Sequence, residues 1–200
     1  RTSGTRTISA RWQLTGSSLA MPHMAASGVS GLDLYVRRDG VWKWLASTKP
    51  SAQKNEVPLA TALPDGDHEF LLYLPLYNGI DKLEVGISPE GKIAGFDPWS
   101  GMRPIVLYGT SILHGGCASR PGMAFPAILG RALGSPTINL GFSGNGKMDI
   151  EVVRLLSEID ASVYVLDWLP NMGAFSEDDI AARTEAAVQL LRGARPGVPV

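Results

Sequence analysis

From residue 104 onward the sequence alternates between short apolar runs and amphipathic stretches, and this alternation constrains the fold more than any other feature. The run "IVLY" is followed by a helical pattern near residues 122–133, and "TINL" by another near residues 149–158. A third run, "SVYVLD", precedes another predicted helix. Ser176 is expected to cap this helix, and its first turn contains the acidic residues "EDD". Strands that alternate with helices form a parallel sheet with helices on both faces. We therefore predict an α/β domain over residues 99–200.

Helix ends and faces follow from the same pattern. The first helix is predicted to end at Gly134, and the face that it turns to the core is predicted to carry Phe125, Ile128, Leu129 and Leu133. The last helix is predicted to end near Gly193, and the closing "PGVPV" indicates entry into another strand. Because the pattern breaks off there, we expect the domain to be C-terminally incomplete.

Residues 1–98 have a different character, with short β-type runs separated by Gly, Pro, Asp and Asn. In "LDLYVRRDGVWKWLAS" apolar residues alternate with polar ones around Asp39-Gly40, which predicts a hairpin turn. Pro75 predicts an edge strand or a bulge. We expect an all-β, jelly-roll-like sandwich here, with "GFDPWSGMRP" as the linker and with Trp42 and Trp44 contributing to the core.

Charge and composition exclude several classes of protein. The formal net charge is −1, from 18 Lys and Arg against 19 Asp and Glu, which does not favour nucleic acid or anionic membranes as partners. No apolar run approaches the roughly 20 residues that span a bilayer. The sequence does not start with a secretory leader, so we expect a soluble protein and leave open a secreted or periplasmic location with the leader removed. The one cysteine, Cys117, excludes internal disulfides and is expected to be a small buried packing residue, and no metal or cofactor is indicated.

Three chemically suited residues follow three consecutive predicted strands. Ser111 comes after "IVLY", Gly144 after "TINL" and Asn171 after "SVYVLD". The carboxyl ends of parallel strands meet at one edge of the sheet, where α/β folds place their chemistry. A serine hydroxyl can act as a nucleophile, and two backbone N–H groups with an amide side chain can hold an oxyanion. We predict Ser111 as nucleophile, with the N–H groups of Ser111 and Gly144 and the Asn171 side chain as oxyanion donors.

These positions resemble the sequence blocks of the SGNH/GDSL family of serine esterases and lipases. The first block is Gly109-Thr110-Ser111, the second is Gly144 in "NLGFSGNG", and the third is Asn171 in "LPNM". The stretches "YGTSILHGGCASRPGMAFPAILGRAL" and "FLLYLPLYNGIDKLEVGI" resemble a subgroup that carries a β-sandwich before the hydrolase domain. The resemblance implies a three-layer α/β/α, flavodoxin-like hydrolase domain and ester hydrolysis without metal or cofactor. The implied substrates are small-molecule or glycan esters of acetyl or other short acyl groups.

The sequence departs from the family at the residues that would activate the nucleophile. Thr110 replaces the usual aspartate, and no histidine follows Asn171, so the family's D-x-x-H block is missing. We expect that block beyond Val200. Asp65 and His68 have the spacing of a D-x-x-H block, but they lie at a predicted turn of the sandwich.

Several residues near the predicted site have open roles. His114 is either at the mouth of the pocket or on the surface, and Trp168 and Asn145 are further pocket candidates, together with Trp99. Asp167 is expected to orient the loop of Asn171, or to cap backbone. Arg120 is either a carboxylate or sugar contact or an exposed residue at the entry to a helix.

Two other functions remain open at this point. Gly141 to Lys147 matches a phosphate-binding loop except that Met148 replaces the hydroxyl residue that would hold Mg²⁺. A carbohydrate-binding protein on a degenerate hydrolase fold is the second alternative. Oligomeric state and the two parts of the ester substrate are not indicated.

Overall fold

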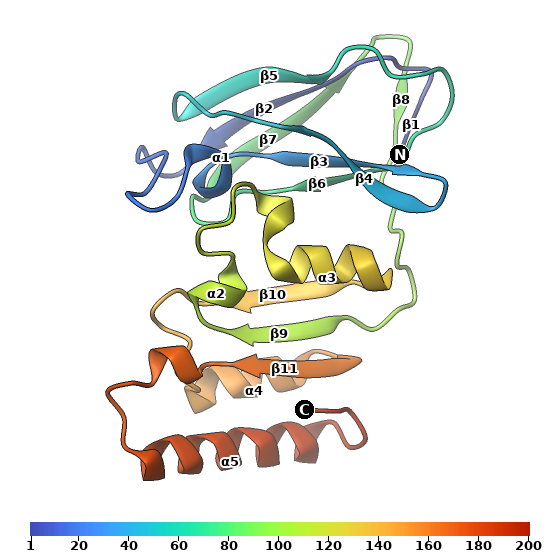
Figure 1. Ribbon diagram of the computed structural model, residues 1–200. Helices are drawn as coiled ribbons and strands as arrows, with labels where there is room; N and C mark the ends of the chain where they lie inside the picture. The colour runs from blue at the N-terminus through green and yellow to red at the C-terminus, as the bar shows by residue number, and fades with distance from the viewer. The chain divides into compact units, whose positions relative to one another are not determined.

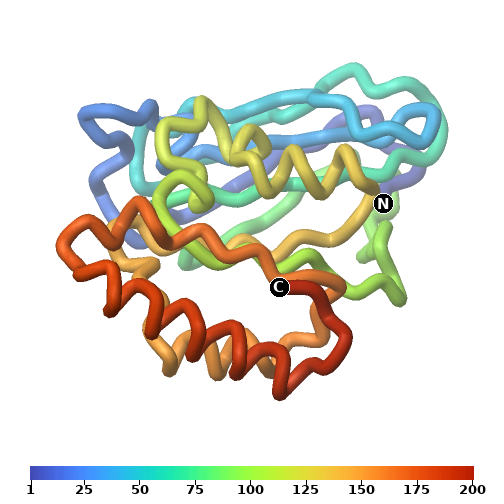
Figure 2. Tube along the Cα trace, turned by 60° about the horizontal axis from the view of Figure 1, so that its bottom comes forward, coloured from blue at the N-terminus to red at the C-terminus, as the bar shows by residue number.

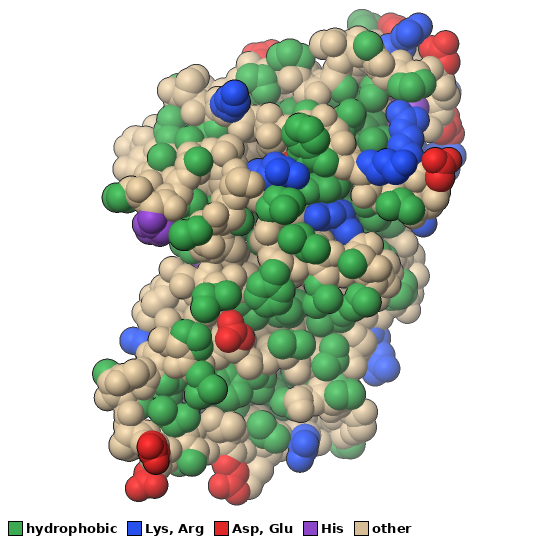
Figure 3. Space-filling model, in the orientation of Figure 1, with side chains coloured by type: hydrophobic (Ala, Val, Ile, Leu, Met, Phe, Trp, Pro, Cys, Tyr) green, Lys and Arg blue, Asp and Glu red, His purple; other side chains and the backbone are tan.

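The computed structural model describes residues 1–200, and the chain divides into two compact units. Unit 1 consists of Arg1–Pro98 together with Cys117–Met123, and unit 2 consists of Trp99–Gly116 together with Ala124–Val200. Figure 1 labels the elements of both. The sequence did not indicate that residues 117–123, which follow the first strand of the second half, belong to unit 1. The face shown in Figure 3 carries both Lys and Arg side chains and Asp and Glu side chains.

Unit 1 consists mainly of antiparallel strands. Two sheets have three strands each, in the orders β5-β2-β7 and β4-β3-β6, and β1 pairs with β8 in a third. One hydrophobic cluster combines inward residues of both three-stranded sheets, among them Trp12 and Leu34. The elements are β1 Thr2–Ser3, β2 Ile8–Leu14, α1 Ala26–Val29, β3 Asp33–Arg38, β4 Val41–Ser47, β5 Lys54–Ala60, β6 Phe70–Tyr73, β7 Ile80–Ile87 and β8 Lys92–Ile93.

Turn chemistry in unit 1 agrees with the sequence. Asp39 and Gly40 connect β3 to β4, and both have positive φ angles, 52° and 77°, as a tight hairpin turn requires. The strand β6 ends before Pro75 and lies at the edge of its sheet. The hairpin and the edge strand are confirmed.

The prediction that Trp42 and Trp44 belong to the core is wrong. Trp44 is 52% exposed and Trp42 is half-buried, whereas Trp12 is only 1% exposed and fills the core. Trp44 pairs with Tyr35, whereas the adjacent Leu34 belongs to the core cluster on the other face of the sheet. Trp42 and Trp44 therefore lie on the face away from that cluster.

Unit 2 contains a parallel sheet in the order β10-β9-β11, so the strand that comes first in the sequence lies in the middle. Gly109 at the end of β9 pairs with Gly141 of β10 and with Asp167 of β11, so all three strands end level with one another. The elements of unit 2 are β9 Ile105–Gly109, α2 Ser111–His114, α3 Phe125–Leu133, β10 Thr137–Gly141, α4 Ile150–Glu158, β11 Val163–Asp167, η2 Leu169–Asn171 and α5 Glu177–Ala194. The short helix η1, Pro121–Met123, lies between α2 and α3 in the sequence but belongs to unit 1.

Helices cover both faces of this sheet. Val106 and Tyr108 of β9 belong to a cluster with residues of α4 and α5, whereas Ile105 and Leu107 belong to a cluster with residues of α2 and α3. Figure 2 shows α3 and α5 on opposite sides of the strands. The alternation of strands and helices is confirmed for the second half of the chain.

The buried face of α3 differs from the prediction at three of its four residues, while the fourth, Leu129, packs against the cluster that contains Leu107. Phe125, Ile128 and Leu133 are 41%, 40% and 59% exposed, and the small residues Pro126, Ala127 and Gly130 are buried instead. A side chain at Gly130 would come within 3.1 Å of Thr137, so only a small residue fits where α3 approaches β10. Gly134 ends the helix in the left-handed conformation, as expected.

The last helix and the end of the chain agree with the sequence in part. The Ser176 hydroxyl accepts a hydrogen bond from the backbone N–H of Asp179 at 3.1 Å and caps α5. The helix runs through Gly193 to Ala194. Beyond it, the carbonyl of Pro199 accepts a hydrogen bond from the N–H of Tyr164 at 3.0 Å, so "PGVPV" does reach the sheet.

Candidate active site

Ser111 lies at a sharp strand-to-helix turn after the central strand of unit 2. The buried Thr110 caps α2 by accepting a hydrogen bond from the N–H of Ile112 at 3.3 Å, and Ser111 is the first residue of the helix. The helix ends after one turn, where the N–H groups of Gly115 and Gly116 donate to the Ser111 carbonyl at 3.1 and 2.7 Å. The half-buried Ser111 keeps its hydroxyl and its backbone N–H free of hydrogen bonds within the chain. Both groups are therefore available to a ligand.

Asp167 holds the turn from the neighbouring strand β11. Its carbonyl accepts the N–H of Thr110 at 2.9 Å, and its carboxylate accepts the Thr110 hydroxyl at 3.3 Å. A side chain at Gly109 would overlap the Asp167 backbone, so the two strand ends approach closely only because position 109 is glycine. The expectation that Asp167 orients the loop of Asn171 is not what the structure shows, since its contacts are with the residue before Ser111.

The loop that follows β10 is fastened to the same turn. The N–H of Phe142 donates to the Gly109 carbonyl at 2.8 Å, and a side chain at Gly146 would overlap that carbonyl. Between these two anchors Gly144 is exposed, has a φ of 74° and has no atom near the position of a β-carbon. Its backbone can therefore approach a ligand closely.

Asn171 connects the third loop to the second. It ends the short helix η2 after β11, and its Nδ2 donates to the carbonyl of Gly146 at 3.2 Å. A side-chain amide has two N–H donors, so one remains after this bond. The structure thus links the loops of all three predicted residues through Gly109 and Gly146.

Two further residues shape the second loop, and the sequence analysis did not single out either contact. The Tyr108 hydroxyl accepts a hydrogen bond from the N–H of Met148 at 3.2 Å, and Met148 is buried with a φ of 62°. Burial raises the pKa of the Tyr108 phenol, so the hydroxyl stays neutral to a higher pH than an exposed tyrosine does. Arg183 of α5 donates to the Lys147 carbonyl at 3.1 Å. No local sequence signal marks these pairs because their partners are 40 and 36 residues apart.

The three pocket candidates lie in different environments. Trp168 is 7% exposed and packs in the core cluster with Tyr108 and Met172, so it does not line an open surface. Asn145 is exposed beside Gly144, and its side chain donates to the Ser143 carbonyl at 3.4 Å. His114 is half-buried at the end of α2, and a side chain at Gly141 would overlap its backbone.

The phosphate-loop alternative is wrong on geometry. In such loops the Lys sits at the start of the following helix, but Lys147 precedes the first residue of α4 by three positions. The residue at the helix N-cap is Asp149, whose carboxylate repels phosphate where that loop would bind it. The loop instead packs against Gly109 and positions Gly144.

Other predicted candidates belong to unit 1 and have structural contacts there. His68 is 4% exposed, and its Nε2 lies 2.8 Å from the Pro64 carbonyl, so the Asp65–His68 pair is part of a turn, as expected. Arg120 pairs with the buried Asp33 at 3.2 Å and does not lie free at a helix entry. Cys117 is exposed, contrary to the prediction of a buried packing residue, and it lies with a φ of 64° in the turn that follows α2.

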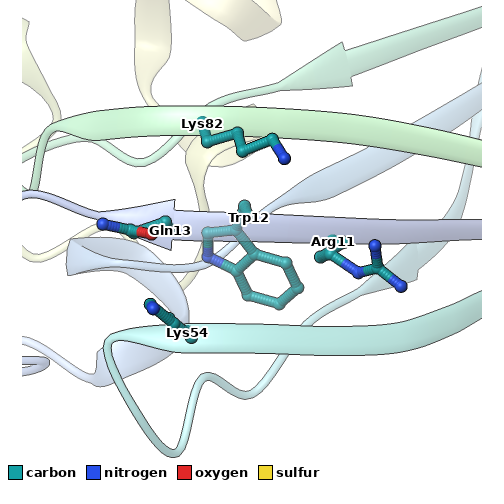
Figure 4. A pocket seen from close by; sticks show the side chains of 5 residues that line it. All are labelled: Arg11, Trp12, Gln13, Lys54 and Lys82. Carbon is teal, nitrogen blue, oxygen red and sulfur yellow. The ribbon is translucent and has the colours of Figure 1, made fainter.

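Unit 1 has a hollow of its own on the outer face of the β5-β2-β7 sheet. A cavity of about 200 Å³ is bordered by Arg11, Trp12, Gln13, Lys54 and Lys82, and Figure 4 shows these side chains on the three neighbouring strands. Two of its cations are already paired, since Arg11 lies 2.9 Å from Glu56 and Lys82 lies 2.9 Å from Glu84. The hollow therefore offers little unpaired charge to a ligand.

Neither a metal site nor a membrane-spanning helix is found in the structure. No group of three or more His, Cys, Asp and Glu side chains is arranged to hold a metal ion. No helix has the length and apolar character needed to cross a membrane.

Comparison with known proteins agrees with the architecture. Residues 102–200 match the GDSL-like lipase/acylhydrolase family, and residues 2–93 match the N-terminus of SGNH-hydrolase-type esterases, a family labelled by the pattern GxDLY. In this chain the pattern is Gly31-Leu32-Asp33-Leu34-Tyr35. No curated protein sequence matches the chain.

Three solved structures share the fold at different levels of identity. A protein described as a GDSL-like lipase from Bacteroides ovatus is 40% identical with a TM-score of 0.91, over 99% of this chain and 57% of that one. The salicylyl-acyltransferase SsfX3 from a tetracycline biosynthetic pathway is 23% identical with a TM-score of 0.76, over 99% and 56%. A family two carbohydrate esterase from Clostridium thermocellum, solved with cellohexaose, is 18% identical with a TM-score of 0.63, over 98% and 66%.

These likenesses cover nearly all of the chain but only part of the other proteins. The chain spans 57% and 56% of the lengths of the first two structures. Both halves of the sequence are matched, each by the family expected for its place in the chain. The chain therefore belongs to the GDSL/SGNH family of lipases and acylhydrolases, in the group whose N-terminal region carries the GxDLY pattern.

Proposed function

We propose that the protein is a serine ester hydrolase whose nucleophile is Ser111. The observation that carries the proposal is the arrangement of three loops at one edge of the parallel sheet. Ser111 follows the central strand, Gly144 and Asn171 follow the strands on either side, and all three strands end level with one another. The family supports ester chemistry, and this arrangement supports the roles that we propose within it.

The proposed reaction begins with attack of the Ser111 Oγ on the acyl carbonyl, while a general base takes the hydroxyl proton. The N–H groups of Ser111 and Gly144 and the free N–H of the Asn171 amide hold the negative charge that develops on the carbonyl oxygen. The tetrahedral intermediate then expels the alcohol, which receives the proton, and leaves an acyl-enzyme. Water hydrolyses the acyl-enzyme by the same steps in reverse order.

The general base is not among the residues that the structure brings to Ser111. His68 belongs to unit 1 and bonds to Pro64, and His114 follows Ser111 by one helical turn with its backbone against Gly141. The related GDSL-like lipase is longer than this chain, which spans 57% of it. We propose that an Asp-His pair outside the 200 residues completes the site in the intact protein, and that residues 1–200 alone have little activity.

The substrate class is the finer part of the proposal. We propose esters of acetyl or other short acyl groups on a carbohydrate or a related alcohol. One structure of the same fold is a carbohydrate esterase, and at 18% identity it supports the fold and leaves the substrate to experiment. The shared cluster between the two sheets of unit 1 supports a β-sandwich there, and helices on both faces of the unit 2 sheet support a three-layer hydrolase domain.

Covalent labelling tests the nucleophile directly. In the intact protein a fluorophosphonate probe should attach to Ser111, and Ser111→Ala should abolish both labelling and hydrolysis of an acetyl ester. Ser143→Ala is the matched control because Ser143 lies in the neighbouring loop without an assigned role. An intact, folded protein that is not labelled, or a Ser111→Ala variant that still is, would overturn the proposal. Comparison of acetyl, butyryl and octanoyl esters then tests the preference for short acyl groups.

A further inference from the structure

The segment Cys117–Met123 is part of unit 1, although it follows the nucleophile helix directly in the sequence. The chain leaves α2 through Gly115 and Gly116, and both N–H groups donate to the carbonyl of Ser111. Cys117, the first residue of the segment, therefore directly follows Gly116, whose N–H is hydrogen-bonded to the carbonyl of Ser111, the proposed nucleophile. Whatever fixes the segment also restrains the C-terminal end of the Ser111 turn.

Asp33 fixes the segment from within unit 1. Its carboxylate is completely buried, and its Oδ2 accepts the backbone N–H of Gly122 at 2.8 Å and lies 3.2 Å from the Arg120 Nε. Its Oδ1 accepts the indole N–H of Trp44 at 3.0 Å, and the Arg120 guanidinium lies 5.0 Å from the centre of the Trp44 ring. A buried carboxylate is costly unless it is paired and hydrogen-bonded, and here residues 120 and 122 of the segment provide two of its contacts.

The fit around the segment is close at two further points. A side chain at Gly122 would overlap the Tyr35 ring and come within 2.7 Å of the Asp33 carboxylate. At the other end, the Ser27 hydroxyl donates to the Ser119 carbonyl at 2.7 Å. The segment is thus held at both ends by residues of the N-terminal region, and no bulkier residue fits at position 122.

Asp33 and Tyr35 are the Asp and Tyr of the Gly31–Tyr35 pattern that labels the N-terminal family. We propose that this pattern is a clamp, and that Asp33 is a positioning residue for the reaction. It holds residues 117–123, and through Gly115 and Gly116 these hold the backbone of Ser111 in the orientation that the oxyanion donors require. This inference rests on the proposed function of Ser111, because the clamp acts through that residue.

Three variants of the intact protein separate a positioning role from a structural one. Asp33→Asn keeps the shape but removes the charge and turns an N–H group toward one of the donors. Gly122→Ala places a methyl group against the Asp33 carboxylate and so disturbs the contact between Asp33 and residue 122. Trp44→Phe is the control, because it removes the hydrogen bond to Asp33 Oδ1, keeps an aromatic ring beside Arg120 and leaves both contacts of Asp33 to the segment.

The measurements are the labelling rate of Ser111, kcat and KM for an acetyl ester, and hydrogen exchange of residues 115–124. We expect Asp33→Asn to lower the labelling rate and kcat by about 10²-fold, as a displaced catalytic group does. KM should change little, and exchange should rise in residues 117–123 while β2, β5 and β7 stay protected. Gly122→Ala should behave in the same way, and Trp44→Phe should stay near the wild type.

Each contrary outcome overturns the clamp. Unchanged exchange of residues 117–123 in both Asp33→Asn and Gly122→Ala would show that the contacts do not hold the segment. Faster exchange with wild-type kcat and labelling would show that the segment does not position Ser111. A Trp44→Phe variant as impaired as Asp33→Asn would place the effect in the N-terminal sheets. If the wild type itself is not labelled, the proposed function fails, whereas the exchange measurement still tests the contacts without any activity.

Discussion

The central strands of the two units, β2 and β9, bury their side chains in different ways. Along β2 buried positions alternate with more exposed ones, so that Trp12 faces the core and Arg11 faces outward. All five residues of β9 are buried. An antiparallel sheet can leave one face to water, whereas a parallel sheet has helices on both faces. In unit 2 the strand faces are covered, so the proposed chemistry is assigned to the strand ends, where Ser111, Gly144 and Asn171 lie.

The largest effect is expected from a cavity in the covered sheet. Leu107→Ala removes a completely buried side chain of β9 and should lower the free energy of unfolding of unit 2 by about 2–5 kcal/mol. The matched change Val85→Ala, at a position of β7 that is 40% exposed, should cost about 0.5 kcal/mol or less. Denaturant unfolding of both variants checks this, and equal losses would contradict the contrast between the sheets.

A change at a strand end should affect rate and leave stability nearly intact. Asn171→Ala removes a proposed oxyanion donor and should lower kcat of the intact enzyme by about 10²–10³-fold. Asn145→Ala removes an exposed amide in the neighbouring loop and should leave kcat near the wild type. Steady-state kinetics with an acetyl ester compares the two, and similar rates for both variants would remove Asn171 from the site.

The buried phenol beneath the second loop should have an intermediate effect. Tyr108→Phe leaves the N–H of Met148 without its acceptor and should lower the free energy of unfolding by about 1–3 kcal/mol. Because burial raises the Tyr108 pKa above 10.0, the unfolded state loses this proton first, so wild-type stability should decline as pH rises above 10.0. Tyr108→Phe cannot lose this proton, so its free energy of unfolding should decline less steeply at alkaline pH. Denaturant unfolding of both proteins at several pH values above 10.0 measures the difference.

The smallest effect is expected on the open face of unit 1. The neighbouring Lys82, and then Arg11, lower the pKa of the half-buried Glu84 below 4.5. This pairing therefore stabilises the fold above pH 4.5 and is lost as the pH falls through the lowered pKa. Glu84→Gln should be slightly less stable than the wild type near neutral pH and equal to it in acid. A difference that grows toward acid pH would reverse the sign of this interaction.

Much of unit 2 follows from local patterns. The three parallel strands, the Gly134 stop and the Ser176 cap are confirmed because apolar period and capping chemistry are properties of neighbouring residues. The face of α3 could not be read in this way, since apolar spacing indicates a stripe but not which residues fit against a close strand. Gly130 faces the sheet because only a small residue fits beside Thr137.

The same division applies to the candidate site. The sequence predicted Ser111, Gly144 and Asn171 as strand-end residues, and their roles stay proposals. It did not reveal that Asp167 holds Thr110 or that Tyr108 holds Met148, because hydrogen bonds between residues 57 and 40 positions apart leave no local pattern. Nor did it reveal that Trp44 is exposed beside Arg120, which depends on which face of β4 the core cluster covers.

The sequence by itself determined the strand and helix order of unit 2, the hairpin at Asp39-Gly40 and the membership of a family, because each depends on residues close together or on ordered blocks. The tertiary structure alone decided that β9 is central and that residues 117–123 belong with unit 1. Strand order and the burial of Asp33 depend on which distant surfaces fit and which buried charges find partners. Such choices follow from packing of the whole chain rather than from any single stretch of it.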